Sequence, residues 1–205
     1  MFRAFTTAAV AIANGARRIV MVGAVDEALA LRAAGVGRFC IGETGGRMPP
    51  GFDYGNSPQQ IAGVDFAGAT LIQRTSAGTQ GIVAAAPRAR RLYAAALVTA
   101  TATARALAAD APDRVTLVAM GENAARRSDE DELCAVHLRH LLQGRRGDPE
   151  AVRRLILAGG AADRFHARAA PHMPPEDAAI ALDIDRYDFA IRVELEDGRP
   201  VARRE

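Results

Sequence analysis

Hydrophobic and polar positions follow two rhythms along the chain, and together they predict strands interleaved with helices. Short apolar runs predict buried strands at residues 18–22, 38–41, 70–73, 91–95, 115–120 and 189–195. Longer stretches with apolar residues three and four positions apart predict helices at 6–14, 26–34, 79–86, 99–110, 129–142, 149–158, 161–169 and 176–183. Such an exchange of strands and helices is typical of an α/β layered sheet. From residue 199 onward the chain reads as a short polar tail.

Composition narrows the chemistry that the chain can perform. Its 205 residues suit one α/β domain over 1–205, or two small lobes that share a sheet. The sequence has no lysine, which excludes a Walker-type phosphate lysine or a Schiff base, so an anion must be bound by arginine, backbone amides or a metal. The formal charge is only +2, the basic residues are scattered, and tryptophan is absent, so nucleic acid is not an expected partner.

Two further features indicate a cytoplasmic protein. Cys40 and Cys134 are far apart and form no CxxC or Cys/His pattern, which suggests a reducing compartment. The apolar stretch 8–13 is too short to span a bilayer, and no charged leader with a cleavage site is recognisable at the N-terminus. We therefore expect a soluble protein with no membrane partner.

The most unusual stretch is the loop of residues 42–58, which is rich in glycine and proline and directly follows a predicted strand. Loops beyond the carboxyl ends of strands form the ligand crevice of α/β sheets, and glycines let backbone N–H groups approach an anion. Glu43 stands at the strand exit, where a carboxylate can hold a hard cation. Ser57 and Pro58 read as a helix cap and first-turn proline. A purely structural connection with simple capping is the alternative.

Two later strand exits carry polar residues of the same kind. Residues 74–79 place hydroxyls and backbone amides just before a helix, which can form a phosphate cradle, although helix capping by Thr79 is the simpler explanation of this segment taken alone. Glu122 follows the predicted strand 115–120, and four acidic residues at 129–132 open the next helix. Such a cluster can compensate the helix dipole or provide the oxygen ligands that Mg²⁺ prefers.

Taken in order, these segments resemble the 2-phosphosulfolactate phosphatase family. The resemblance is carried by Arg3-Ala4-Phe5-Thr6-Thr7 with the Ala-Asn-Gly-Ala run at 13–16, Gly42-Glu43, Gly51-Phe52-Asp53-Tyr54-Gly55-Asn56-Ser57-Pro58, Thr75-Ser76-Ala77-Gly78-Thr79, and Glu130-Asp131 with Cys134-Ala135. The block that ends in Asn-Ser-Pro is the most specific of these. A chance occurrence of all of them in this order is improbable.

The resemblance implies a three-layer α/β/α fold with a mixed, largely parallel sheet, and the Mg²⁺-dependent hydrolysis of 2-phospho-3-sulfolactate to 3-sulfolactate and phosphate, as in coenzyme M biosynthesis. It also implies that the separate strand exits converge on one site. The catalytic residues would then be Arg3, Glu43, Glu130 and Asp131. The metal ligands would come from Glu43, Glu122, Glu130 and Asp131. Contacts to the substrate, a small phosphorylated acid, would come from Asn56, Ser57, Thr75, Ser76, Gly78 and Thr79.

The sequence departs from the family pattern in two places. Val136 follows Cys134-Ala135 where the family usually has glycine, so helix packing can differ there. The family also has an acidic residue and a strand that would lie upstream of Met1, and we hypothesise that the start of the chain is assigned too far downstream. Two alternatives stay open: a phosphatase for another small 2-phospho acid, and a catalytically inactive ligand-binding homologue. The alanine-rich helix at 99–109 is compatible with a homo-oligomer.

Overall fold

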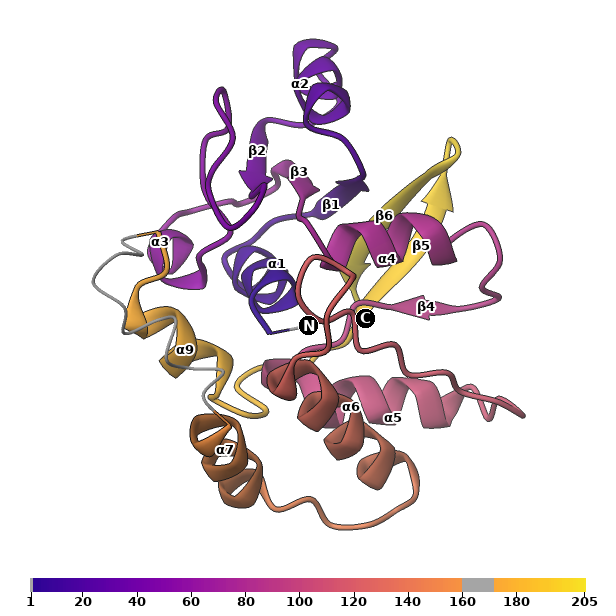
Figure 1. Ribbon diagram of the computed structural model, residues 1–205. Coiled ribbons are helices and arrows are strands. Elements are labelled where there is room, and N and C mark those ends of the chain that lie inside the picture. Colours follow the sequence, from indigo (N-terminus) through magenta and orange to yellow (C-terminus); the bar gives the residue numbers. More distant parts are fainter. Residues whose placement is uncertain (1, 160–171) are drawn as a thin grey trace.

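The computed structural model describes residues 2–159 and 172–205 and shows one six-stranded mixed sheet (Figure 1). The strands lie in the order β2-β3-β1-β6-β5-β4. One half is parallel, with β3 between β1 and β2, and the other half is antiparallel. The strand bounds are β1 Arg18–Val22, β2 Phe39–Gly42, β3 Thr70–Arg74, β4 Leu92–Tyr93, β5 Ile191–Glu196 and β6 Arg199–Arg204.

Alternate residues of the parallel strands face two different cores, which gives the molecule three layers. Ile19 and Met21 of β1 face a large core on the side of helix α1 (Ala4–Ala13), whereas Val20 and Val22 face a smaller core. The smaller core is covered by α2 (Val25–Ala33), which stands alone on that face in Figure 1. Both faces of the parallel half are therefore buried, as the α/β expectation requires.

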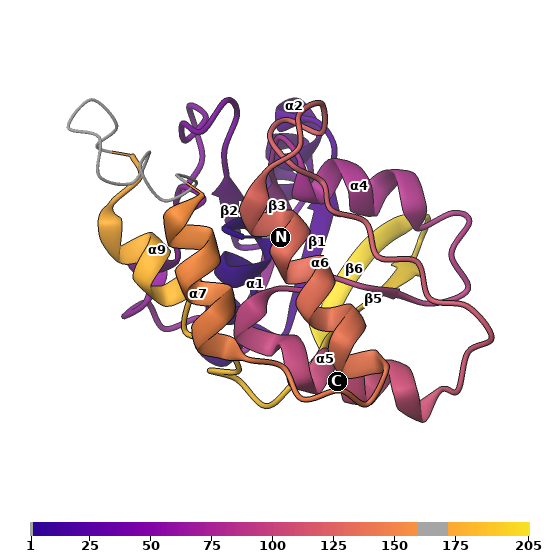
Figure 2. The same ribbon diagram turned by 60° about the horizontal axis from the view of Figure 1, so that its bottom comes forward.

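The remaining helices lie on the side of the larger core. α3 (Pro58–Ile61) packs on α9 (Pro175–Ala181), and α6 (Asp129–Leu142) packs on both α5 (Ala100–Ala109) and α7 (Pro149–Ala158), as Figures 1 and 2 show. α4 (Gly78–Ala85) lies against β1, β3 and β6, and a 3₁₀ turn (Leu97–Thr99) precedes α5. In the described part of the chain, no helix is long and apolar enough to cross a membrane.

Helix α1 is the central element of this layer, because nine of its ten residues are buried. It ends at Gly15, whose φ of +94° lies in the left-handed region that favours glycine. A Cβ at this position would lie 2.9 Å from Cα of Ala67, so the close approach of the chain also requires glycine. The residues after α1 therefore turn sharply into β1.

Most predicted elements are present, and β1, α6 and α7 have the predicted bounds. The predicted strand 115–120 is wrong: this segment forms no strand, because no strand of the described chain hydrogen bonds to it. The predicted strand 91–95 shortens to β4, and the predicted polar tail is instead β6. The hairpin between β5 and β6 turns at Asp197 and Gly198, both with positive φ, which is the strongest short-range hairpin signal in a sequence. The predicted helix 161–169 lies outside the described residues.

Candidate active site

Three turns that are distant in sequence meet around the start of α1, near the N label in Figure 1. The side-chain amide of Gln73, at the end of β3, donates to the carbonyl of Ala4 at 2.8 Å. At the start of α4, a Cβ on Gly78 would lie only 2.7 Å from Cβ of Ala4. The backbone N–H of Phe2 donates to Oδ1 of Asp131 at 3.0 Å, which brings the start of α6 to the same place.

Glu43 joins the exits of β2 and β3. Its buried carboxylate accepts three hydrogen bonds, from the N–H of Ser76 at 2.6 Å, from the hydroxyl of Ser76 at 2.8 Å and from the N–H of Gly46 at 2.7 Å. Its own backbone N–H donates to the carbonyl of Arg74 at 2.9 Å. Glu43 therefore connects the turn after β2 to the turn after β3, and the expected convergence of these two turns is confirmed.

Arg74 stabilises the same region, which we call the junction: the turns after β2 and β3, with Glu43 and Ser76, beside the start of α1. Its guanidinium donates to the carbonyl of Glu43 at 2.7 Å, to Oγ1 of Thr44 at 2.8 Å and to the carbonyl of Gly23 at 3.2 Å. Gly42 has a φ of +139°, and a Cβ there would lie 1.8 Å from the carbonyl oxygen of Arg74. No side chain fits at this position, so the tight backbone contact between β2 and β3 depends on glycine.

The predicted phosphate cradle at 75–79 contains two buried threonines that cap one another and a serine that is only partly buried. Thr75 and Thr79 are almost completely buried and cap one another, because each backbone N–H donates to the other's hydroxyl, at 2.8 and 3.0 Å. Ser76 is only part-buried, and Gly78 is packed against α1. The threonines thus hold the shape of the turn, whereas the Ser76 hydroxyl donates to Glu43 and accepts from the N–H of Gly45 at 3.0 Å, which joins this turn to the exit of β2.

Arg3 stands at the N-cap of α1 and carries positive charge into the junction. Its Nη1 lies 3.8 Å from Oδ2 of Asp177 and 3.5 Å from the carbonyl of His172. Burial lowers the pKa of the Arg3 guanidinium, and the carboxylates of Asp177 and Glu43 act in the opposite direction. α1 has no side-chain cap, and a helix N-terminus with an arginine favours the binding of an anion.

Asn56 and Ser57 are buried just before α3, and Ser57 is connected to Arg3 through Asp177. The hydroxyl of Ser57 accepts from the N–H of Gln60 at 3.2 Å, which confirms the predicted cap, and donates to Oδ1 of Asp177 at 2.6 Å. Oδ1 of Asn56 is buried without a hydrogen-bond partner in the described chain. Asn56 therefore retains an acceptor that a ligand or water could use.

Sequence reasoning missed Asp177 and His172. Asp177 is fully buried, and burial raises its pKa, although hydrogen bonds from Ser57 and Gln59 act to lower it. Burial lowers the pKa of the His172 imidazole, and the charges of Arg47 and Arg3 lower it further. No local pattern marks either residue, because Asp177 lies 120 positions from its partner Ser57.

The acidic start of α6 is folded inward. Glu130 and Asp131 are buried, and the two oxygens of Asp131 accept from the backbone N–H groups of Phe2 and Gly121, at 3.0 and 2.9 Å. Glu122 is half exposed and lies 3.8 Å from Arg126. Within residues 2–159 and 172–205, no group of three or more histidine, cysteine, aspartate or glutamate side chains could hold a metal. The four predicted metal ligands are therefore not gathered into one cluster.

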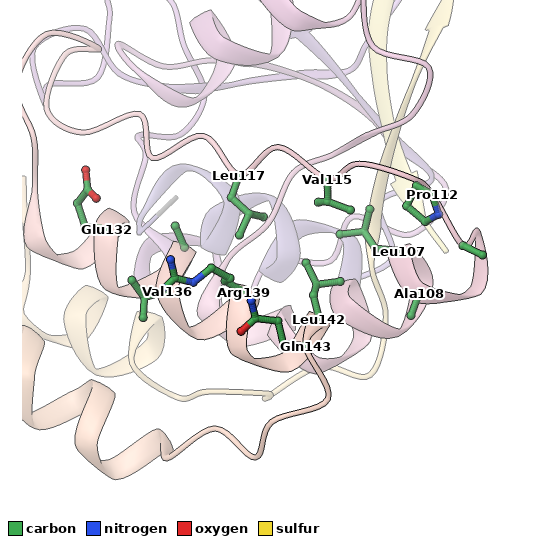
Figure 3. A pocket seen from close by; sticks show the side chains of 12 residues that line it. Leu107, Ala108, Pro112, Val115, Leu117, Glu132, Val136, Arg139, Leu142 and Gln143 are labelled. Carbon is green, nitrogen blue, oxygen red and sulfur yellow. The ribbon is translucent and has the colours of Figure 1, made fainter.

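A separate cleft of about 580 Å³ lies between α5, α6 and the extended segment that joins them (Figure 3). Its lining is mostly apolar and comprises Leu107, Ala108, Ala111, Pro112, Val115, Leu117, Glu132, Ala135, Val136, Arg139, Leu142 and Gln143. Of the acidic residues at 129–132, Glu132 lines this cleft, and none of the catalytic, metal-binding or substrate-binding residues that the family resemblance implies does. Glu43, Ser76 and Asp131 lie instead around the start of α1, outside this cleft.

This fold defines an α/β protein in which two strand exits and the starts of α1, α4 and α6 meet at one polar junction. The chain belongs to the 2-phosphosulfolactate phosphatase family, because the sequence model of that family, 2-phosphosulpholactate phosphatase, matches residues 1–162. The resemblance found in the short motifs is thereby confirmed.

Individual relatives agree with the family match. A probable 2-phosphosulfolactate phosphatase from Deinococcus radiodurans is 34% identical over 142 residues, which are 69% of this chain and 59% of that protein. One from Thermus thermophilus is 32% identical over 77% of this chain and 66% of its own length. One from Bacillus subtilis is 28% identical over 100% of this chain and 89% of its own length. The chain thus spans about three fifths to two thirds of the first two relatives.

Proposed function

We propose that this protein is a cytoplasmic phosphatase that hydrolyses 2-phospho-3-sulfolactate to 3-sulfolactate and inorganic phosphate, a step of the type used in coenzyme M biosynthesis. Two observations support the proposal. The chain belongs to the family whose relatives carry this name. The convergence of Arg3, Glu43 and Ser76 at the start of α1 carries most of the argument, because it joins a cation, a carboxylate and a hydroxyl beside two helix N-termini.

The geometry suits a small ligand with several negative charges, as a phosphorylated sulfonated hydroxy acid would be. Arg3, together with the backbone amides of the first turn of α1, can neutralise the phosphate oxygens. Arg47 and His172 lie close enough to Arg3 to share one electrostatic environment, so a second acidic group could be accommodated beside the phosphate. The ligand's charge, rather than an apolar pocket, would then decide its binding.

Hydrolysis requires a water oxygen to bond to phosphorus while the bond from phosphorus to the ester oxygen breaks. The water proton passes to an acceptor, and the hydroxyl group of the product acquires a proton. Glu43 is the carboxylate at the junction that can orient such a water, because its two oxygens are already fixed by Ser76 and Gly46. Arg3 and the backbone amides would stabilise the charge that spreads over the phosphoryl oxygens.

We further propose that the reaction needs Mg²⁺. This ion commonly keeps several waters and is bound through one or two carboxylates together with the substrate phosphate, so a preformed cluster is not required. Glu43, Glu130 and Asp131 are the buried carboxylates that would hold it. When bound, Mg²⁺ would supply charge neutralisation of the phosphate and activation of water.

The test is phosphate release by the purified protein from 2-phospho-3-sulfolactate, from 2-phospholactate and 2-phosphoglycerate, and from p-nitrophenyl phosphate, with Mg²⁺ and with EDTA. We expect the first substrate to react fastest, and EDTA to abolish the release. Arg3→Ala should lower kcat/KM by about a hundredfold, since it removes a cation that faces the developing charge. Glu194→Gln, a half-exposed residue on β5, is the matched control and should react like the unchanged protein.

The outcomes separate the alternatives. Faster release from another 2-phospho acid would favour a phosphatase of different specificity. Binding of the acids without release from any ester would favour a catalytically inactive homologue and would contradict the proposed function. Release that persists in EDTA would remove the proposed role of Mg²⁺ while leaving the hydrolysis itself intact.

A further inference from the structure

Asp177 connects two parts of the candidate site through one fully buried carboxylate. Oδ1 accepts from the hydroxyl of Ser57 at 2.6 Å and from the N–H of Gln59 at 3.1 Å. Oδ2 lies 3.8 Å from Nη1 of Arg3, whose side chain is 12% exposed. The start of α9 therefore reaches both the start of α3 and the start of α1.

This arrangement offers more than a link between helices. The hydrogen bonds to Ser57 and Gln59 would suffice to dock α9 on α3, and they use one oxygen of the carboxylate. The other oxygen makes no hydrogen bond within the described chain and lies 3.8 Å from Nη1 of Arg3, whose guanidinium also feels the charge of Glu43. A long arginine side chain has many rotamers, and ordering them when a ligand binds costs entropy. A charged partner that already holds the side chain in one orientation lowers this cost.

Asp177 also lies beyond the region that carries the family motifs. The family match ends at residue 162, whereas Arg3, Glu43 and Ser57 all lie within it. Within the described chain, the C-terminal helix α9 thus contributes a carboxylate to a site whose other predicted members come from residues 3–131.

We propose that Asp177 is a positioning residue of this site: it fixes Ser57 through one oxygen and holds the guanidinium of Arg3 through the other, so that Arg3 is oriented to receive an anionic substrate. This inference rests on the proposed function. It predicts that loss of the Asp177 charge weakens anion binding through Arg3, and not through loss of the fold.

The experiment measures binding of inorganic phosphate by isothermal titration calorimetry with Mg²⁺ present, for the unchanged protein, Asp177→Asn, Arg3→Ala and the double variant. Asn keeps the size and one acceptor oxygen but removes the charge beside Arg3. We expect Asp177→Asn to weaken phosphate binding by about tenfold or more, since one partner of a buried charge pair is lost. In the double variant, the affinity should be within about twofold of Arg3→Ala alone, because both changes act through one group.

Asp183→Asn is the matched control, because Asp183 follows α9 and is half exposed in its pair with Arg186. It should bind phosphate like the unchanged protein. Thermal unfolding of every variant separates loss of the fold from loss of binding. If Asp177→Asn does not fold, Asp177→Glu keeps the charge but displaces the carboxylate by one methylene, and it should also weaken binding.

Three results would overturn the positioning role: unchanged phosphate affinity in the folded Asp177 variants, effects of Arg3→Ala and Asp177→Asn that simply multiply, or no phosphate binding by the unchanged protein. Failure of the proposed hydrolysis looks different. In that case no ester releases phosphate, but phosphate still binds in a manner that depends on Arg3 and Asp177, and the positioning role is supported.

Discussion

Two regions of the molecule have a similar sequence pattern but fold differently: the junction at the ends of β2 and β3, and the segment 111–128. Each has a run of apolar residues followed by a glutamate, Glu43 in the first and Glu122 in the second. At the junction, Glu43, Arg74 and Ser76 form a closed set of hydrogen bonds at the end of paired, buried strands. No residue of 111–128 is buried, although 115–120 contains a run of apolar and β-branched side chains suited to a strand. A strand-like pattern becomes a strand only where a neighbouring strand satisfies its backbone.

The same contrast separates the predicted site residues. Glu43 directly follows β2, which has a parallel partner in β3, and its carboxylate accepts three hydrogen bonds. Glu122 follows the segment without a strand partner, and it remains half exposed beside Arg126. We infer that a carboxylate keeps one position when the backbone around it is rigid. Matched substitutions in the junction and in the segment 111–128 test this difference in rigidity.

The largest difference is expected for glycine to alanine changes. At Gly42, alanine would have φ near +139° and would overlap the carbonyl of Arg74 between two locked strands, so we expect a loss of about 4 kcal/mol in unfolding free energy. At Gly121, a Cβ would lie 2.0 Å from the carbonyl of Arg126, but the surrounding loop is exposed and can shift. We expect Gly121→Ala to cost only about 1 to 2 kcal/mol. Urea unfolding of both variants measures the difference.

Equal losses for the two glycine variants would contradict the contrast between a rigid junction and a yielding loop. Gly35→Ala serves as the control for positive φ alone, because φ is +75° there and no atom lies within 4 Å of the added Cβ. Its cost should match the backbone strain of alanine in the left-handed region, about 1 kcal/mol. The excess at Gly42 over Gly35 then reports the steric overlap.

A smaller but still large effect is expected for Glu43→Ala. The change leaves the N–H groups of Gly46 and Ser76 without their acceptor in a part-buried place, and charged hydrogen bonds are the stronger kind. We expect a loss of about 3 kcal/mol in unfolding free energy, together with loss of phosphate release. A stability within about 0.5 kcal/mol of the unchanged protein would show that the carboxylate does not organise the junction.

An alkaline loss of stability should come next in size. Cys134 lies on α6, the helix that anchors the open segment through Asp131, and burial raises the pKa of its thiol from 9.0 to about 12. Between these values the unfolded chain loses a proton that the folded chain keeps, so stability falls as pH rises. We expect a loss of about 1 kcal/mol between about pH 9 and about pH 10 from this group.

Thermal or urea unfolding across this pH range tests the thiol, with Cys134→Ala as the variant that lacks it. The profile of Cys134→Ala should be flatter by the stated amount. Tyr93, whose pKa burial raises to about 12 as well, contributes only at higher pH, since its ordinary value is 10.0. Identical slopes for both proteins below about pH 10 would show that Cys134 is accessible to solvent.

How far the sequence predicts the molecule follows from the same comparison. Local signals were sufficient for β1, α6 and the Ser57 cap, because periodicity and capping act within a few residues. The resemblance to the family implied that the exit of β2 meets that of β3, and the parallel pairing of the two strands, which end at the same edge, explains why they do. Asp177 could not be found, since its role depends on a contact 120 residues away. Periodicity alone also could not show that 115–120 lacks a strand partner.

The smallest effect is expected in the open segment, where Val118 is 58% exposed. Val20 of β1 is 2% exposed, and both valines lie in segments that the sequence predicts as strands. Valine to threonine keeps the shape of the side chain and replaces one methyl group by a hydroxyl group, so the substitution probes the burial of that position. Val20→Thr should cost about 2 kcal/mol, because the hydroxyl is buried without a partner.

Val118→Thr should change the unfolding free energy by less than about 0.5 kcal/mol, because its hydroxyl stays in water. Urea unfolding of both variants under one set of conditions makes the measurement. A cost for Val118→Thr equal to that of Val20→Thr would mean that 115–120 is buried as a strand in solution. The start of α6 would then be held by a paired strand at Gly121, and the acidic residues there would be as rigid as Glu43.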